Sequence, residues 1–172
     1  MLKFLGCIMI LAASTGIGFI YSAKFKKRTR QLEEVQRCIY QLQNEIVYTH
    51  TPLPEAIEDV SKKSIYPIKE IFEEVSSLLF DNKVNNVHEA FRNVLDRRKD
   101  MLNLKRDDMN ILLDFSKNLG ESDIEGQQRI FHLTLENLKK RIKDSEVLMS
   151  KNVKMYRYLG FSLGAIIVII IV

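Results

Sequence analysis

Histidines and carboxylates are the residues of this chain that could do acid–base or metal chemistry, and their spacing does not favour either. His50, His88 and His132 fall in three separate segments of the sequence. His88-Glu89 begins like the H-E-x-x-H helix of zinc proteases, but the second histidine is missing. We therefore expect each histidine to be a surface or capping residue.

Adjacent acidic residues form three pairs, Glu33-Glu34, Glu73-Glu74 and Asp107-Asp108. Neighbouring residues of a helix point about 100° apart, so the members of a pair cannot converge on one metal ion. We expect these pairs to lie on solvated faces. The sequence also lacks a glycine-rich phosphate loop, a Ser/His/Asp set and a C-x-x-C motif. It therefore predicts no catalytic residues, no metal site and no cofactor.

Two uncharged apolar runs lie at the two ends of the chain. The first, from Phe4 to Ala23, has the roughly twenty residues that a helix needs to cross a bilayer. The second, from Leu159 to Val172, reaches that length only if the residues before it enter the interface and Arg157 extends its charge to the headgroups. We predict a transmembrane helix over residues 1–23, a domain over 24–157 and a second transmembrane helix over 158–172.

Basic residues gather on the inner side of both runs: Lys24, Lys26, Lys27, Arg28, Arg30, Lys151, Lys154 and Arg157. The positive-inside rule then predicts that the domain is cytoplasmic and that both termini lie outside. We expect these side chains to contact anionic headgroups at the membrane surface. A cleaved secretory signal at the N-terminus is the alternative interpretation of the first run.

Charge is distributed unevenly along the chain. The formal net charge is +4, yet residues 38–138 hold twelve basic and eighteen acidic residues. The surplus of cations lies close to the two apolar runs, where a membrane surface accounts for it. Nucleic acid is therefore not an expected partner, although basic patches also serve nucleic-acid binding.

The domain is predicted to be all-α. Apolar residues repeat at helical spacing at Leu32, Val35, Ile39, Leu42 and Ile46. The expected helices run over residues 24–48, 55–63, 67–82, 86–98, 102–118 and from 122 to beyond 159. We expect a single bundle of about six helices, flanked by the two spans.

The last helix is predicted to run unbroken into the second apolar run, because neither proline nor glycine interrupts residues 127–159. The first and last helices should then pack side by side as an antiparallel pair. Gly160 and Gly164 form a G-x-x-x-G pattern, which allows two spans to approach closely.

Three segments carry a resemblance to a known family. They are Glu45-Ile-Val-Tyr-Thr-His-Thr-Pro-Leu-Pro-Glu-Ala56, Leu119-Gly-Glu-Ser-Asp123 followed by Gln127 or Gln128, and Lys154-Met-Tyr-Arg-Tyr-Leu-Gly160. In these segments, in their order and in length the chain resembles the stage III sporulation protein AB family of endospore-forming bacteria. The resemblance covers essentially the whole chain.

The resemblance implies a fold and a role. The family is similar to the cytoplasmic domain of the type II secretion F protein, which is a six-helix bundle. It implies a non-enzymatic component of the channel apparatus in the mother-cell membrane around the forespore. The implied partners are the other proteins of that apparatus, notably its cytoplasmic secretion-type ATPase. This chain has one such domain where the F protein has two, so the resemblance implies that either self-association or other subunits replace the second domain, if anything does.

A membrane-bound regulatory or signalling protein without catalytic activity is the alternative function that the same anatomy permits. For the assembly role, the first two motif segments should meet at the edge of the bundle that lies furthest from the lipid. The candidate partner surface there comprises Thr51, Leu53, Glu55, Glu121, Asp123 and Gln127.

Overall fold

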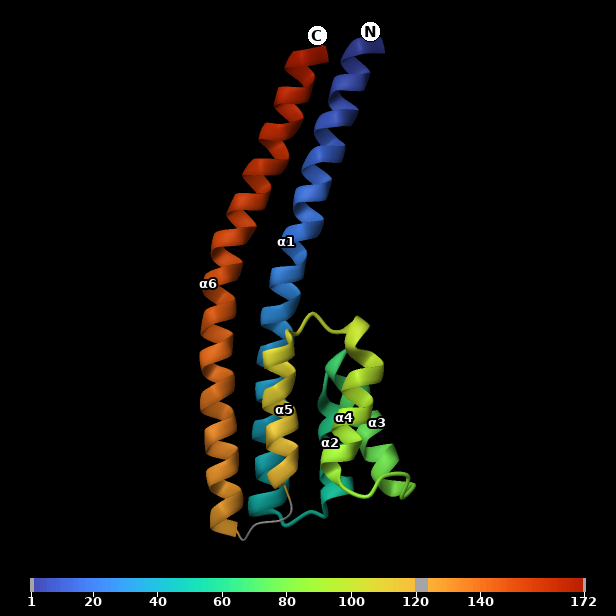
Figure 1. Ribbon diagram of the computed structural model, residues 1–172, viewed down its shortest axis with the longest axis vertical. Helices are drawn as coiled ribbons and strands as arrows, with labels where there is room; N and C mark the ends of the chain where they lie inside the picture. The colour runs from blue at the N-terminus through green and yellow to red at the C-terminus, as the bar shows by residue number, and fades with distance from the viewer. Residues whose placement is uncertain (1, 120–123, 172) are drawn as a thin grey trace. The chain divides into compact units, whose positions relative to one another are not determined.

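The chain folds into α-helices throughout the part that the computed structural model describes, which is the backbone of residues 2–119 and 124–171. The helices are α1 (Leu2–Gln43), α2 (Leu53–Lys63), α3 (Ile68–Phe80), α4 (Val87–Arg98), α5 (Arg106–Asn118) and α6 (Ile124–Ile171) (Figure 1). Side chains are not described at residues 2–12, 14, 15, 17–19, 21, 22, 124, 157, 160, 161, 163–165 and 167–171. No strand occurs in the described backbone, so the prediction of an all-α fold is confirmed.

The helices divide into two compact units. One unit, residues 30–143, is the helical bundle and contains α2 to α5 whole, together with the end of α1 and the beginning of α6. The other unit comprises residues 1–29 and 144–172, and therefore only parts of α1 and α6.

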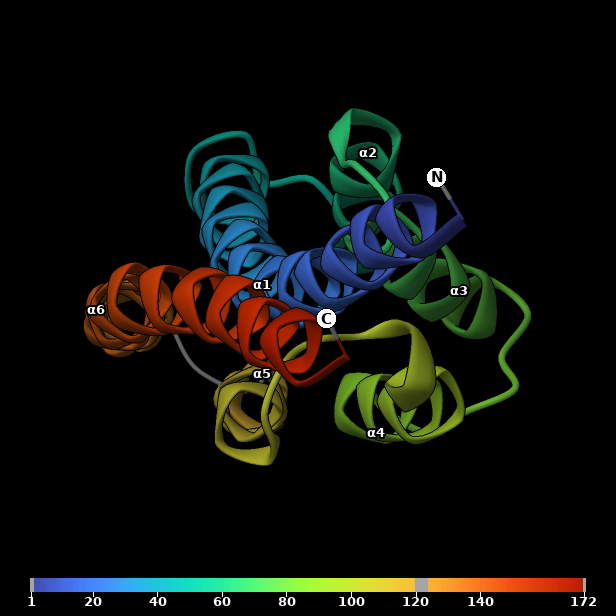
Figure 2. The ribbon, with the colours of Figure 1, turned by 90° about the horizontal axis from the view of Figure 1, so that it is seen from above.

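The bundle is held by one apolar core. Helices α2, α3, α4 and α5 pack in succession, each against the next (Figure 2). The largest fully buried side chains include Phe72, Phe91, Phe115 and Phe131. Phe72 and Phe91 meet edge to face with ring centroids 5.7 Å apart, and Phe115 and Phe131 do so at 5.1 Å. Such aromatic pairs contribute about 0.5–1.5 kcal/mol beyond the burial of their area.

The apolar stripe of the first helix faces this core. Leu32, Val35, Ile39 and Leu42 are buried, and Ile46 packs against the core while half-buried. The 3-4 spacing of these residues places them on one side of α1, which leaves the opposite side polar. The stripe that the sequence predicts is therefore confirmed.

The start of α4 shows how local sequence sets a helix boundary. Asn86 Oδ1 accepts a hydrogen bond of 2.8 Å from the backbone N–H of Glu89, and Glu89 Oε2 accepts one of 2.9 Å from the backbone N–H of Asn85. These bonds satisfy donors that a helix start leaves unpaired. The helix predicted to begin at about residue 86 is confirmed, and Asn86 is its N-cap.

The start of α5 differs from the prediction. The helix begins at Arg106, not at Leu102. Gln31 Oε1 accepts a hydrogen bond of 2.7 Å from the backbone N–H of Asn103. Asp108 Oδ2 accepts one of 2.9 Å from the backbone N–H of Lys105 and so fixes the first turn. A contact from α1 therefore holds the chain extended just before α5, which the local sequence did not indicate.

The unit of residues 1–29 and 144–172 pairs α1 with α6. Thr29 Oγ1 and Ser145 Oγ are hydrogen-bonded at 2.8 Å, and both residues are buried. Further along, the rings of Phe25 and Tyr156 stack with centroids 6.0 Å apart. Residue numbers fall along α1 as they rise along α6, so the pair is antiparallel, as predicted. Within the described residues, none of the helices combines the length and the apolar character that a membrane crossing requires.

Candidate functional site

The described residues contain no group of three or more His, Cys, Asp or Glu side chains that could hold a metal ion. His50 and His132 are exposed. His88 is half-buried, and its Nδ1 lies 3.2 Å from both Leu113 O and Ser116 Oγ, which ties α4 to α5. The exposed positions of His50 and His132 agree with the prediction of surface residues, whereas His88 joins two helices and is neither a surface nor a capping residue.

One member of each acidic pair is exposed and the other is used inside the bundle. Glu33 is exposed, whereas Glu34 is buried and accepts hydrogen bonds of 2.9 Å from Arg37 Nε and 2.8 Å from the backbone N–H of Ile65. The prediction of a solvated face is wrong for Glu34, because it joins α1 to the segment between α2 and α3.

The electrostatics of Glu34 follow from these contacts. Burial disfavours its charged form, but the hydrogen bonds from Arg37 and Ile65 outweigh burial and hold the pKa of Glu34 below its ordinary value. The carboxylate is therefore a fixed structural charge at neutral pH, and it does not have the raised pKa of a general acid.

Asp108 is the second buried carboxylate. Its side chain is fully buried, and Arg141 Nε lies 3.2 Å from its Oδ1. Asp107, its neighbour, is 71% exposed and also reaches Arg141, with Oδ2 2.7 Å from Nη2. The predicted solvated face is wrong for Asp108, because the guanidinium of α6 pairs with it in the interior. The same holds in part for Glu74, which pairs with Arg97 and Arg98 of α4.

Cys38 is the one cysteine whose surroundings the structure describes, and it is not a reactive thiol. It is buried, with Sγ 3.2 Å from Ser64 Oγ. Burial raises the pKa of Cys38 to about 11. Since the thiolate is the nucleophile, this environment opposes covalent catalysis at neutral pH.

The segment after α1 is an ordered turn built around Glu45. A π-helical turn, Asn44–Tyr48, follows α1 directly. Glu45 Oε2 then accepts hydrogen bonds from the hydroxyls of Thr49 at 3.2 Å and Thr51 at 3.1 Å, and Glu45 Oε1 lies 3.5 Å from Lys63 Nζ. These contacts show that Glu45, Thr49 and Thr51 of the motif segment 45–56 have a structural role in the turn.

The same turn presents two side chains to solvent. Tyr48 is 67% exposed, and His50 is exposed with a positive φ of 56°. Left-handed backbone is uncommon for a residue other than glycine and persists where the surroundings determine it. The contacts of Glu45 with Thr49 and Thr51 hold the backbone on both sides of His50. We infer that they also hold Tyr48 and His50 at fixed positions on the surface.

The residues predicted to form the partner surface lie in different environments. Glu55 is exposed, Thr51 and Gln127 are half-buried, and Leu53 packs against the core. Glu121 and Asp123 lie outside the described residues. In the bundle, the end of α1, the start of α2, the end of α5 and the start of α6 share one end (Figure 1). The described members of the predicted surface therefore differ in accessibility: Glu55 is exposed, Thr51 and Gln127 are partly accessible, and Leu53 supports the core.

The residues predicted to contact headgroups are mostly exposed. Lys24, Lys26, Lys27, Arg30, Lys151 and Lys154 all have exposed side chains. Arg28 is buried, with 6% exposure, so it cannot serve a lipid surface in this conformation. It lies next to Thr29 on the side of α1 that is covered. The side chain of Arg157 and the surroundings of Gly160 and Gly164 lie outside the described part of the chain.

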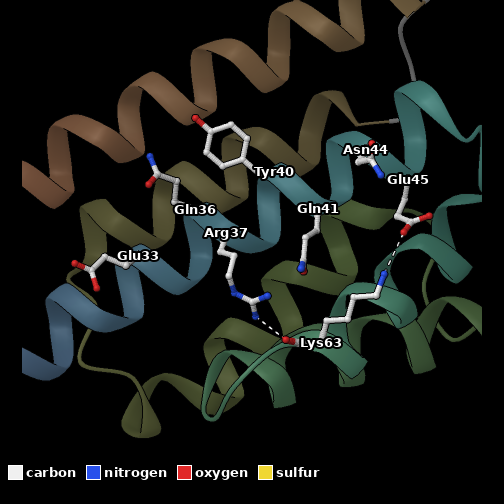
Figure 3. A pocket seen from close by; sticks show the side chains of 8 residues that line it. All are labelled: Glu33, Gln36, Arg37, Tyr40, Gln41, Asn44, Glu45 and Lys63. Atoms are coloured by element: carbon white, nitrogen blue, oxygen red, sulfur yellow. Dashed lines mark hydrogen bonds and ion pairs between the residues drawn. The ribbon is translucent and has the colours of Figure 1, made fainter.

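A polar groove of about 520 Å³ lies along the bundle, and sequence reasoning did not find it. Seven of its lining residues come from α1 and the turn after it, and one comes from the end of α2 (Figure 3). The lining comprises Glu33, Gln36, Arg37, Tyr40, Gln41, Asn44, Glu45 and Lys63. The 3-4 spacing of the α1 members is a signal that could have found one face, but the α2 wall depends on tertiary packing.

In the described residues the protein is an all-helical bundle. Its buried polar residues hold helices together, and its groove is lined by polar side chains. The family model for stage III sporulation protein AB matches residues 3–172. The stage III sporulation protein AB of Bacillus subtilis (strain 168) is 32% identical over 171 residues, covering 99% of each chain. A solved structure of a stage III sporulation protein AB (SpoIIIAB) matches with a TM-score of 0.66 and 30% identity, covering 71% of this chain and 95% of the other. The chain belongs to the stage III sporulation protein AB family, and the resemblance seen in its motifs is confirmed.

Proposed function

We propose that this protein is a non-enzymatic platform on which a secretion-like channel apparatus assembles during endospore formation. The family membership supports the sporulation role. The observation that carries the platform role is that the buried carboxylates, the buried thiol and the half-buried histidine described above are all tied into the structure of the bundle. Glu34 and Asp108 join helices, Cys38 has a raised pKa, and His88 bridges α4 and α5.

We propose further that both ends of the chain anchor the protein in the mother-cell membrane around the forespore, with the bundle in the cytoplasm and both termini outside. The support is in the sequence: an uncharged run at each end and basic residues on the inner side of both. Most side chains of the two runs lie outside the described residues. The exposed lysines at Lys24, Lys26, Lys27, Lys151 and Lys154 fit contact with anionic headgroups.

The partner surface in this proposal is the end of the bundle where α1 ends and α6 begins. Its exposed members are Tyr48, His50 and Glu55, and Gln127 is a partly accessible member. The partner is the cytoplasmic secretion-type ATPase of the same apparatus. A second copy of this chain is a further candidate partner. Because the membrane fixes the other end of α1 and α6, this end of the bundle is the one that a cytoplasmic protein reaches without approaching the lipid.

Copurification from the membranes of sporulating cells tests the platform role. The tagged full-length chain, extracted in mild detergent, should bring down the ATPase in the parent and lose most of it in the double variant Glu55→Ala, Gln127→Ala. The matched control is Asn93→Ala, Asp96→Ala, which changes two exposed residues of α4. Equal copurification by all three, with normal spore yield, would contradict the assignment of the partner surface.

A further inference from the structure

The basic and acidic side chains that line the groove along α1 differ in how far they are paired. It is lined by two basic side chains, and both are already engaged. Arg37 donates to Glu34 Oε2 at 2.9 Å and to Lys63 O at 2.6 Å. Lys63 Nζ lies 3.5 Å from Glu45 Oε1. Figure 3 shows the contact of Arg37 with the Lys63 carbonyl and that of Glu45 with the Lys63 amine, which join α1 and the turn after it to the end of α2.

The acidic and acceptor groups of the groove are not all engaged in this way. Glu33 is exposed and has no ion pair within the described residues. Gln41 Oε1 is buried and has no hydrogen-bond partner there. Because this oxygen is buried, a ligand lying in the groove does not contact it directly. The accessible charge of the groove that is not engaged within the described residues is therefore the carboxylate of Glu33, which favours a positively charged ligand.

An exposed aromatic ring in the groove also favours a positively charged ligand. Tyr40 lines the groove with 55% of its surface exposed, although the side chains next to it on the core side of α1 are buried. A ring in this position offers its face to a cation, an interaction of about 0.5–1 kcal/mol at exposed sites. Glu33 and Tyr40 lie seven residues apart, which is two turns of the same face of α1.

We propose that this groove binds a lysine- or arginine-bearing segment of a partner protein. Charge complementarity carries the proposal: the cations of the groove are neutralised, while the carboxylate of Glu33 and the ring of Tyr40 are exposed. The wider surface agrees, because residues 38–138 hold eighteen acidic and twelve basic side chains. This inference rests on the proposed platform function and names a second surface for it, along the side of the bundle.

The test uses the full-length chain in neutral nanodiscs and a fluorescent deca-lysine peptide as the probe, with binding followed by anisotropy. Glu33→Gln should weaken binding about threefold, as expected for an exposed ion pair, and Tyr40→Leu should weaken it by about the same factor. The matched control is Glu73→Gln, an exposed carboxylate of α3 that has a lysine one turn away, as Glu33 has an arginine. It should leave binding unchanged.

A second measurement locates the probe. A benzophenone side chain in place of Tyr40 should cross-link the deca-lysine peptide, and the same group in place of the exposed Phe80 should not. Equal weakening by Glu33→Gln and Glu73→Gln would overturn the proposal. So would cross-linking to a second copy of the chain in place of the peptide, or tighter binding of a deca-glutamate probe. If copurification of the ATPase stands while the peptide results fail, the groove assignment is wrong and the platform survives. If the ATPase does not copurify while the peptide binds as predicted, the platform proposal is wrong and the groove assignment stands.

Discussion

Asp108 of α5 and Arg141 of α6 form an ion pair inside the bundle, with Arg141 Nε 3.2 Å from Asp108 Oδ1 and the carboxylate fully buried. Asp108 also accepts the backbone N–H of Lys105 at 2.9 Å and so fixes the first turn of α5. One carboxylate therefore sets a helix start and joins two helices. Its exposed neighbour Asp107 meets the same guanidinium from the solvent side.

Asp108→Ala should destabilise the protein by about 3 kcal/mol, because it leaves the guanidinium without its buried partner and removes a helix cap. Asp107→Ala should change stability by less than about 1 kcal/mol, as expected for an exposed pair. Thermal unfolding of the full-length chain in detergent, followed by circular dichroism, measures both. Equal losses from the two neighbours would show that burial of Asp108 does not matter.

Glu34 should make stability depend on pH on the acid side. Its pKa is lower in the folded state than the ordinary value of 4.5, so its contribution is fully present above that value and is lost as pH falls through the folded pKa. The parent should therefore lose more stability than Glu34→Gln between neutral pH and about pH 3. Parallel stability curves for parent and variant over that range would show that the Arg37 and Ile65 contacts do not stabilise the charge.

Thr29 and Ser145 should behave as a coupled pair. Thr29→Val keeps the shape of the side chain and leaves the buried Ser145 hydroxyl without its partner, which should cost about 1 kcal/mol. Adding Ser145→Ala should cost little more, so that the double-mutant cycle gives a coupling of about 0.5 kcal/mol or more. Additive losses in thermal unfolding would mean that the 2.8 Å contact contributes nothing to the pairing of α1 with α6.

Most helices of this protein follow from its sequence because apolar periodicity marks them and most of their boundaries carry local signals. Leu32, Val35 and Ile39 reveal the buried face of α1, and Asn86 with Glu89 reveals the start of α4. The start of α5 at Arg106 does not follow, since the hydrogen bond from Asn103 to Gln31 holds the preceding segment extended, and that contact links residues far apart in sequence.

The candidate surfaces can be predicted from the sequence less completely than the helices. An acidic pair such as Asp107-Asp108 shows that two carboxylates point in different directions, but not which of them meets Arg141. The burial of Arg28 depends likewise on tertiary packing, whereas the sequence pattern shows only its charge and its position near the apolar run. The groove depends on Arg37 meeting the carbonyl of Lys63, a contact between two helices that only the fold brings together.

Membrane topology tests the central claim most directly, because the platform role requires the bundle to be held at the membrane on its cytoplasmic side. Cys7 and Cys38 are replaced, Asn85→Cys supplies a single exposed thiol between α3 and α4, and intact cells are treated with a membrane-impermeant maleimide. The account predicts that the protein stays in the membrane fraction after a carbonate wash and is labelled only after lysis. Labelling without lysis, or release of the chain by the wash, would contradict it.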